Sequence, residues 1–181
     1  RFAQLTQQLS ILNLNFSKNV LESTNSFSKL ITDRKSLKGI PENLLQIART
    51  KAQEKKSDGY LFDLSTPSYL AIMKYADNRD LRKEFYMAYN QRGSHQYDNE
   101  TVIYEILKCR EEIARLLKFE NYAEYALQDR MAKNSTSVFT MLDQMKEAAL
   151  NKGREEIADL TQYAQKNGFK EKTLQGWDVT Y

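Results

Sequence analysis

The chain has few of the residues from which many catalytic sites are built. Among its 181 residues there is one histidine, His95, and one cysteine, Cys109. A lone cysteine excludes an internal disulfide and is typical of proteins from reducing compartments. A catalytic zinc site takes about three protein ligands, and the HExxH motif alone needs two histidines on one helical face. The chain therefore cannot form such a zinc site by itself.

Glycine and proline are also scarce, with six and two residues. β-Sandwiches and β-barrels have many turns that use both residues, so their scarcity favours long helices. No stretch approaches the run of about 18 apolar residues that a membrane-spanning helix needs. We therefore predict a helical protein that makes no use of a membrane.

The charged residues give no sign of a nucleic-acid partner. The net charge is +3, from 27 basic and 24 acidic side chains that are interspersed. Tyr86 and Tyr89 lie near Arg92 in the sequence, and such a mixture could stack on single-stranded nucleic acid. The alternative is that the tyrosine rings pack inward. We favour the alternative because Asp80 and Glu84 lie on the same segment, and we expect no nucleic-acid partner.

The remaining reactive residues have ordinary explanations. His95 stands in a polar segment and is interpreted as a solvated loop histidine, although a Ser–His–Asp arrangement is possible in principle. Cys109 is interpreted as a small buried hydrophobic residue in preference to a nucleophile. Adjacent acids such as those at 111–112 and 155–156 do not face each other on a helix. We therefore predict no catalytic, cofactor-binding or metal-binding residue in this chain.

Apolar residues at helical spacing predict an all-α fold of long antiparallel helices, with at most one short strand or hairpin near 59–64. Helices are expected over 3–32, from Pro41 into the polar run that reaches Ser57, from Thr66, over 78–92, over 99–118, from 121 to about 131, and through roughly residue 166 at the end. Asn121 with Glu124 resembles a capping box at the start of the sixth helix, and Asn134 or Ser135 is expected to cap the last one. The apolar residues expected to face inward include Leu5, Leu9, Phe27, Ile31, Ile106, Leu107, Ile113, Leu116, Leu142, Met145, Ala149 and Leu160.

The two ends of the sequence suggest an excised piece. The chain opens without methionine inside a helical pattern, and it closes soon after Trp177-Asp178. Helices of about 30 residues are about 45 Å long, which is long for a compact bundle of this size. We interpret residues 1–181 as one helical region of a longer protein. Self-association through exposed apolar helix faces is expected, because a cut would expose them.

Amphipathic patterning alone does not explain the residues of two sequence segments, Tyr75–Arg82 and Phe119–Tyr125. Together with further segments they resemble the thimet oligopeptidase family of zinc metallopeptidases, and its oligopeptidase A branch in particular. The resembling segments, in family order, are 39–41, 59–64, 67–69, 75–94, 98–99, 106–127, 131–132, and 177–179 with Tyr181. Lys118 is a departure, because the family often has glycine there.

The resemblance implies a cytoplasmic zinc endopeptidase that hydrolyses short peptides. It also implies that the HExxH motif and the downstream glutamate ligand lie outside this chain, so no family zinc ligand or catalytic residue maps onto it. The chain would then form helical scaffold and part of the substrate channel wall. By itself it would be inactive and would bind no zinc. The alternative is a self-contained helical module that binds peptides or proteins without catalysis.

Overall fold

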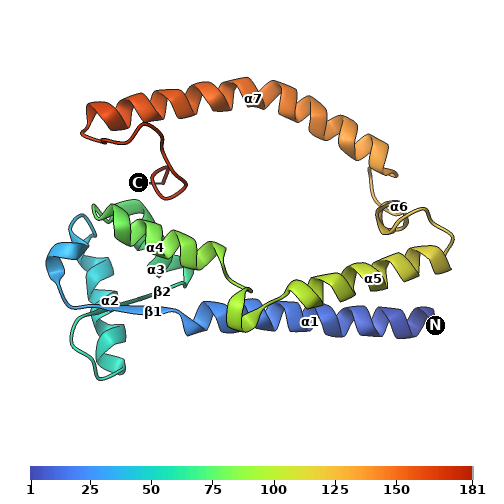
Figure 1. The fold of residues 1–181 in the computed structure, drawn as a ribbon, viewed down its shortest axis with the longest axis horizontal. Coiled ribbons are helices and arrows are strands. Elements are labelled where there is room, and N and C mark those ends of the chain that lie inside the picture. Colours follow the sequence, from blue (N-terminus) through green and yellow to red (C-terminus); the bar gives the residue numbers. More distant parts are fainter. Residues whose placement is uncertain (181) are drawn as a thin grey trace. The chain divides into compact units, whose positions relative to one another are not determined.

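The computed structural model describes residues 1–180, and Tyr181 of the resembling motif lies outside the described residues. The described part contains seven α-helices and one antiparallel sheet of two short strands (Figure 1). The predicted mainly helical class is confirmed. The chain divides into two compact units. The first unit comprises residues 1–17 and 99–172, and the second comprises residues 18–98 with the segment from Thr173 onward.

Two antiparallel helices form the core of the first unit. They are α1 (Phe2–Ser26), through its first sixteen residues, and α5 (Glu100–Leu116). The buried side chains between them are Leu5, Leu9, Ile106, Cys109 and Ile113. This core confirms the predicted inward faces of both helices near their pairing.

Polar contacts fix the register of α1 against α5 at both ends. Arg1 forms an ion pair with Glu112, and the Asn99 side-chain amide donates to the Phe16 carbonyl at 3.2 Å. Residues near the start of α1 thus lie beside the end of α5, and residues further along α1 lie beside its start. The predicted antiparallel arrangement holds for this pair.

The first unit also contains α6 (Tyr122–Leu127) and the long α7 (Ser135–Lys166), orange to red in Figure 1. No residue of α7 is buried. The expectation that Leu142 and Met145 face a core is therefore wrong for this structure, because both are exposed. Leu107 and Leu116 of α5 are exposed as well, because α1 covers only one side of that helix.

The second unit contains the sheet. Strand β1 (Ser28–Ile31) pairs antiparallel with β2 (Tyr60–Asp63), with Ser28 opposite Asp63 and Ile31 opposite Tyr60. The prediction of a single helix over 3–32 is wrong at its end, because α1 stops at Ser26. A lone strand over 60–63 would leave its backbone groups without partners, so residues 28–31 satisfy them in extended form.

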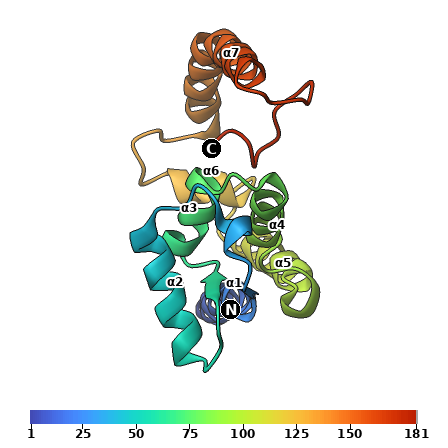
Figure 2. The ribbon, with the colours of Figure 1, turned by 90° about the vertical axis from the view of Figure 1, so that its left-hand side faces the viewer.

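Three helices pack around this sheet, namely α2 (Glu42–Glu54), α3 (Thr66–Tyr75) and α4 (Arg79–Asn90), which face the viewer in Figure 2. Short 3₁₀ turns, η1 (Arg34–Leu37) and η2 (His95–Tyr97), complete the unit. Its core is centred on Phe62, Ile72 and Phe85, and the rings of Phe62 and Phe85 meet edge to face at 6.5 Å. Apart from residues 28–31, the predicted strand and helix positions are confirmed in this unit to within a few residues.

Candidate functional site

The reactive side chains singled out in the sequence are dispersed. His95 opens the turn η2 with a positive φ of 57°, and Cys109 is buried against α1 in the first unit. Burial, with the nearby Glu112 and Glu105, raises the pKa of the Cys109 thiol. A thiol of raised pKa is a poor nucleophile at neutral pH, because little of it is ionised.

Nothing in the described part of the chain resembles a metal centre. Within residues 1–180 no three His, Cys, Asp or Glu side chains gather in a way that could hold an ion. The donor set that zinc takes in peptidases, nitrogen ligands with a carboxylate, is not assembled by these residues. The residues present therefore do not fit the zinc that the family resemblance implies, and no catalytic step is derived through it.

The structure does bring together two of the sequence motifs, at the start of α4. The Arg79 guanidinium donates from Nε and Nη2 to the two carboxylate oxygens of Asp178, both at 2.9 Å. Arg82 Nη2 donates to Asp178 Oδ1 at 3.2 Å. We call Arg79, Arg82 and Asp178 the Asp178 cluster. It joins residues 96 and 99 positions apart in the sequence.

Arg82 is the buried member that connects three parts of the second unit. Its side chain is 4% exposed. Its Nη1 donates to the Ala76 carbonyl at 2.7 Å, and its Nε donates to the Trp177 carbonyl at 2.9 Å. A buried guanidinium is tolerated only where its donors are satisfied and its charge is paired. Arg82 therefore fixes the end of α3 and the 175–178 turn onto α4.

The electrostatics of Asp178 follow from these contacts. Its side chain is 3% exposed, and burial by itself raises the pKa of its carboxyl group. The hydrogen bonds from Arg79, from the Gln175 N–H at 3.0 Å and from Arg82 outweigh burial, so the pKa of Asp178 lies below its usual value. The carboxylate is thus charged and paired at neutral pH. These are the properties of a structural contact and not of a group that takes up and releases a proton.

Aromatic packing completes this contact. The rings of Trp177 and Tyr86 meet edge to face at 5.7 Å, and Lys83 lies 5.4 Å from the centre of the Trp177 ring. At Gly176, a Cβ atom would lie 2.4 Å from the Tyr86 hydroxyl. Glycine at this position therefore lets the 175–178 turn approach α4 without displacing the Tyr86 ring.

A second motif, around Asn121, also serves to place a helix. The Asn121 side chain accepts a hydrogen bond from the Glu124 N–H at 3.0 Å and caps α6. The predicted capping box is only half present, because the Glu124 carboxylate instead accepts from the Ser135 backbone and hydroxyl at the start of α7. Asn134 caps α7 by accepting from the Ser137 N–H at 2.8 Å, as predicted. These contacts fix the turn between α6 and α7.

The tyrosines near arginines make contacts within the second unit. The rings of Tyr69 and Tyr89 stack at 4.2 Å, and the Arg92 guanidinium lies 3.5 Å from the centre of the Tyr89 ring. Each of these rings is partly buried. The interpretation that these rings pack inward agrees with this geometry, whereas the absence of a nucleic-acid partner stays a prediction.

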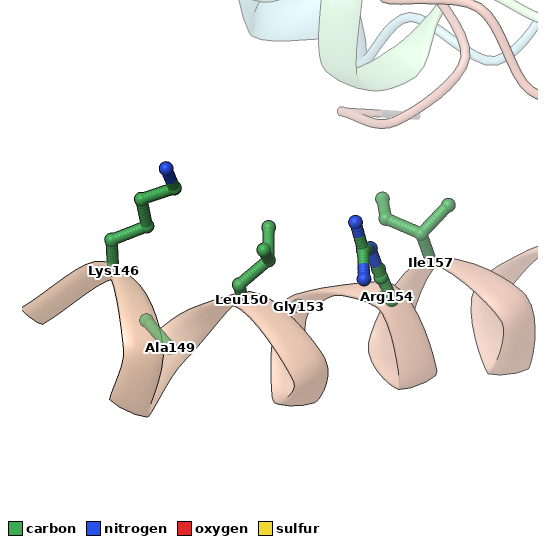
Figure 3. A pocket seen from close by; sticks show the side chains of 6 residues that line it. All are labelled: Lys146, Ala149, Leu150, Gly153, Arg154 and Ile157. Carbon is green, nitrogen blue, oxygen red and sulfur yellow. The ribbon is translucent and has the colours of Figure 1, made fainter. Parts of the chain in front are cut away.

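A shallow hollow lies on the surface of α7, seen from close by in Figure 3. Its lining comes from one helix: Lys146, Ala149, Leu150, Gly153, Arg154 and Ile157. Gly153 leaves the gap between the side chains of Leu150 and Ile157 (Figure 3). Its two charged lining residues, Lys146 and Arg154, come from the same exposed helix as the apolar ones, so the hollow does not enclose a ligand as a small-molecule site does.

Sequence reasoning identified the residues of these sites but missed their contacts. Tyr75–Arg82 and Trp177-Asp178 were both noted as motifs, yet no local pattern shows that Asp178 lies between two arginines of the first run. One feature of the sequence could have indicated this contact. Arg79 and Arg82 are one turn apart on the same face of a helix and can together bind a carboxylate, and Asp178 lies in an aromatic segment further along the chain.

Comparison with known proteins agrees with the resemblance. The chain is 42% identical over 187 aligned residues to oligopeptidase A of Salmonella typhimurium, covering 100% of this chain and 27% of that protein. Oligopeptidase A of Escherichia coli is 41% identical with the same coverage. A probable cytosolic oligopeptidase A of Arabidopsis thaliana is 38% identical over 99% of this chain and 27% of its own length. The chain thus spans about a quarter of the length of these relatives.

A sequence profile of peptidase family M3 matches residues 72–181. This range contains all three residues of the Asp178 cluster, the cap Asn121, and all of α7. None of the described helices is long and apolar enough to cross a membrane. The match covers more than half of the chain, and the chain therefore belongs to peptidase family M3.

Proposed function

We propose that residues 1–181 form the helical scaffold and part of the channel wall of a zinc-dependent oligopeptidase that hydrolyses short peptides. The observation that carries the proposal is the alignment of the whole chain with proteins named oligopeptidase A. In this proposal the residues are one helical region of a larger peptidase. The zinc ligands and the catalytic glutamate are contributed by other parts of that protein.

The geometry supports a scaffold role. The charged residues of the M3-matching motifs pair in the Asp178 cluster and cap α7, and neither contact leaves a group free for chemistry. A catalytic group needs a pKa near the working pH, whereas the pKa of Asp178 is lowered by its partners. The role proposed for this cluster is to hold the 175–178 turn against α4.

The type of cleavage, the cellular location and the substrate length in this proposal are inferred from the family. The proposed peptidase is an endopeptidase, works in the cytoplasm, and takes short peptides because a channel between helical lobes admits only those. The proposal assigns no catalytic, cofactor-binding or metal-binding residue to residues 1–181, and no nucleic-acid or membrane partner. Self-association of the chain stays a prediction.

The test compares two purified proteins. One is the 181-residue chain, and the other is the product of the longest reading frame that contains its sequence. Zinc is measured by elemental analysis, and hydrolysis is measured with a quenched fluorescent peptide of about ten residues. We expect one zinc and chelator-sensitive hydrolysis in the longer protein, and neither in the 181-residue chain.

Two results would overturn the proposal. Stoichiometric zinc with hydrolysis in the 181-residue chain would place the chemistry within these residues. The second result is that the longer protein has no zinc and hydrolyses no peptide, while the 181-residue chain folds cooperatively and binds peptide. This result would favour a helical interaction module. A matched control is His95→Ala, which should leave zinc content and hydrolysis of the longer protein unchanged, because His95 has no part in the proposed site.

A further inference from the structure

The pair Asn167-Gly168 follows the last residue of α7, at the red end of this helix in Figure 1. Asn167 is the only asparagine of the chain that is followed by glycine. The side-chain amide of an asparagine can be attacked by the backbone nitrogen of the next residue, and a side chain on that residue hinders the attack. Glycine has no Cβ, so its backbone nitrogen leaves the amide of Asn167 the least hindered in the chain.

Hydrogen bonds at the end of α7 form a Schellman motif around Gly168. The Gly168 N–H donates to the Gln165 carbonyl at 3.1 Å, and the Phe169 N–H donates to the Ala164 carbonyl at 3.0 Å. Gly168 has a φ of +95°, in the left-handed region that this motif uses just after the helix. The helix end therefore explains the glycine, and the glycine places an unhindered nitrogen directly after an asparagine.

Asn167 is open to water and has room to move in this chain. Asn167 and Gly168 are both exposed, and a Cβ atom on Gly168 would meet no described atom within 4 Å. The attack needs a rotation of ψ at Asn167, which is 19° in the structure, and it needs the Gly168 N–H to leave the Gln165 carbonyl. Only the last turn of α7 has to open for this change, and helix ends fray.

The other asparagines of the chain provide internal comparisons. The smallest residue that follows any of them is serine, after Asn25 and after Asn134. The hydroxymethyl group of serine hinders the backbone nitrogen at both positions. The Asn134 side chain is also held as the cap of α7, because its oxygen accepts from the Ser137 N–H at 2.8 Å. Both asparagines should therefore react more slowly than Asn167.

We infer that Asn167 is a site of spontaneous deamidation in the 181-residue chain. The Gly168 nitrogen loses its proton and bonds to Cγ of Asn167, the Cγ–Nδ2 bond breaks, and ammonia leaves. Water then adds to one of the two carbonyls of the succinimide ring, and the ring C–N bond breaks there. The product is aspartate or isoaspartate at position 167. The inference goes beyond the proposed function and does not rest on it.

Deamidation at this position weakens the end of α7. Asn167 Nδ2 donates to the Tyr163 carbonyl at 2.9 Å, and a carboxylate has no such donor. The new negative charge lies beside the last carbonyl groups of the helix, at the negative end of its dipole. Isoaspartate also lengthens the main chain by one carbon atom, which moves the Gly168 and Phe169 N–H groups away from their acceptors. The modified chain should therefore lose the last turn of α7.

The test follows the mass of each asparagine-containing peptide while the purified 181-residue chain is kept warm at mildly alkaline pH for several days. Digestion at acidic pH stops the reaction before the masses are measured. We expect the peptide with Asn167 to gain about one dalton, as two separable isomers, before any other peptide does. The gain should be slower at acidic pH, because the Gly168 nitrogen must lose a proton. Asn167→Gln is the matched control and should show no gain, since its longer side chain closes a less favourable ring.

The variant Asn167→Asp tests the effect on the helix, because it carries one of the two products from the start. Its helical circular dichroism signal and its melting temperature should be lower than those of the parent chain. A native chain whose Asn167 peptide is unchanged, after the same peptide has reacted in urea, overturns the inference, because the end of α7 would then stay closed. An earlier gain at Asn25 or Asn134 overturns it as well. An Asn167→Asp chain as helical and as stable as the parent contradicts the expected loss of the last turn.

Discussion

Replacement of Asp178 by asparagine tests whether the Asp178 cluster holds the second unit together. The asparagine has nearly the same size but no charge, so the variant removes the ion pairs with Arg79 and Arg82 and keeps the packing. The Asp178 and Arg82 side chains are 3% and 4% exposed, whereas Arg79 is 33% exposed. The substitution therefore removes an ion pair from a buried guanidinium at Arg82 and from a partly exposed one at Arg79.

The expected magnitude follows from that burial. Removing one partner of a buried ion pair typically costs about 3–5 kcal/mol. Arg79 can turn to water, and Arg82 keeps hydrogen bonds to the Ala76 and Trp177 carbonyls. We therefore expect the lower end, a loss of about 3 kcal/mol in the free energy of unfolding of the second unit.

The assay is urea denaturation followed by two signals. Trp177 is the only tryptophan of the chain and adjoins Asp178, so its fluorescence reports on the 175–178 turn, while far-ultraviolet circular dichroism reports on all helices. In Asp178→Asn the fluorescence transition should move to lower urea than the circular dichroism transition. The control is Glu84→Gln, which removes an exposed ion pair with Lys29 and should cost less than about 1 kcal/mol. Equal losses in the two variants would refute the assignment of a structural role to the Asp178 cluster.

Three further predictions concern single groups. The pKa of Asp178 is lower in the folded chain than in the unfolded one. Its contribution to stability is therefore complete above about pH 5 and is lost as the pH falls below about 4. An acid titration followed by Trp177 fluorescence should show this loss of stability, and the Asp178→Asn variant should lack this pH dependence. Gly39 has a φ of +92°, and a Cβ there would lie 2.1 Å from a backbone oxygen, so Gly39→Ala should destabilise the chain by more than about 2 kcal/mol in thermal melts. Gly168→Ala, with a φ of +95° but open space, should cost only about 1 kcal/mol, and equal effects would contradict the role of the clash. Cys109, buried and with a raised pKa, should react with a thiol reagent at neutral pH many times more slowly in the native chain than in urea, and equal rates would show that the α1–α5 pair opens freely.

The sequence by itself determined the features that depend on neighbours a few residues apart. The caps at Asn121 and Asn134 were predicted because a short polar side chain can reach the N–H three residues on. The class was predicted from apolar spacing, and Leu5 with Leu9 was correctly predicted to face a core. The family resemblance was also carried by short runs, and the comparisons confirm it.

Only the tertiary structure decided which distant residues meet and which apolar sides are covered. Residues 28–31 pair as a strand because β2 offers backbone partners, although their apolar spacing alone fits a continued helix. Asp178 meets Arg82 across 96 positions, and no local rule relates two residues so far apart. The apolar side of α7 has the spacing of a core face in the sequence, yet no residue of this helix is buried in the structure. The sequence could not show this, because periodicity shows that one side of a helix can be buried and does not show what covers it.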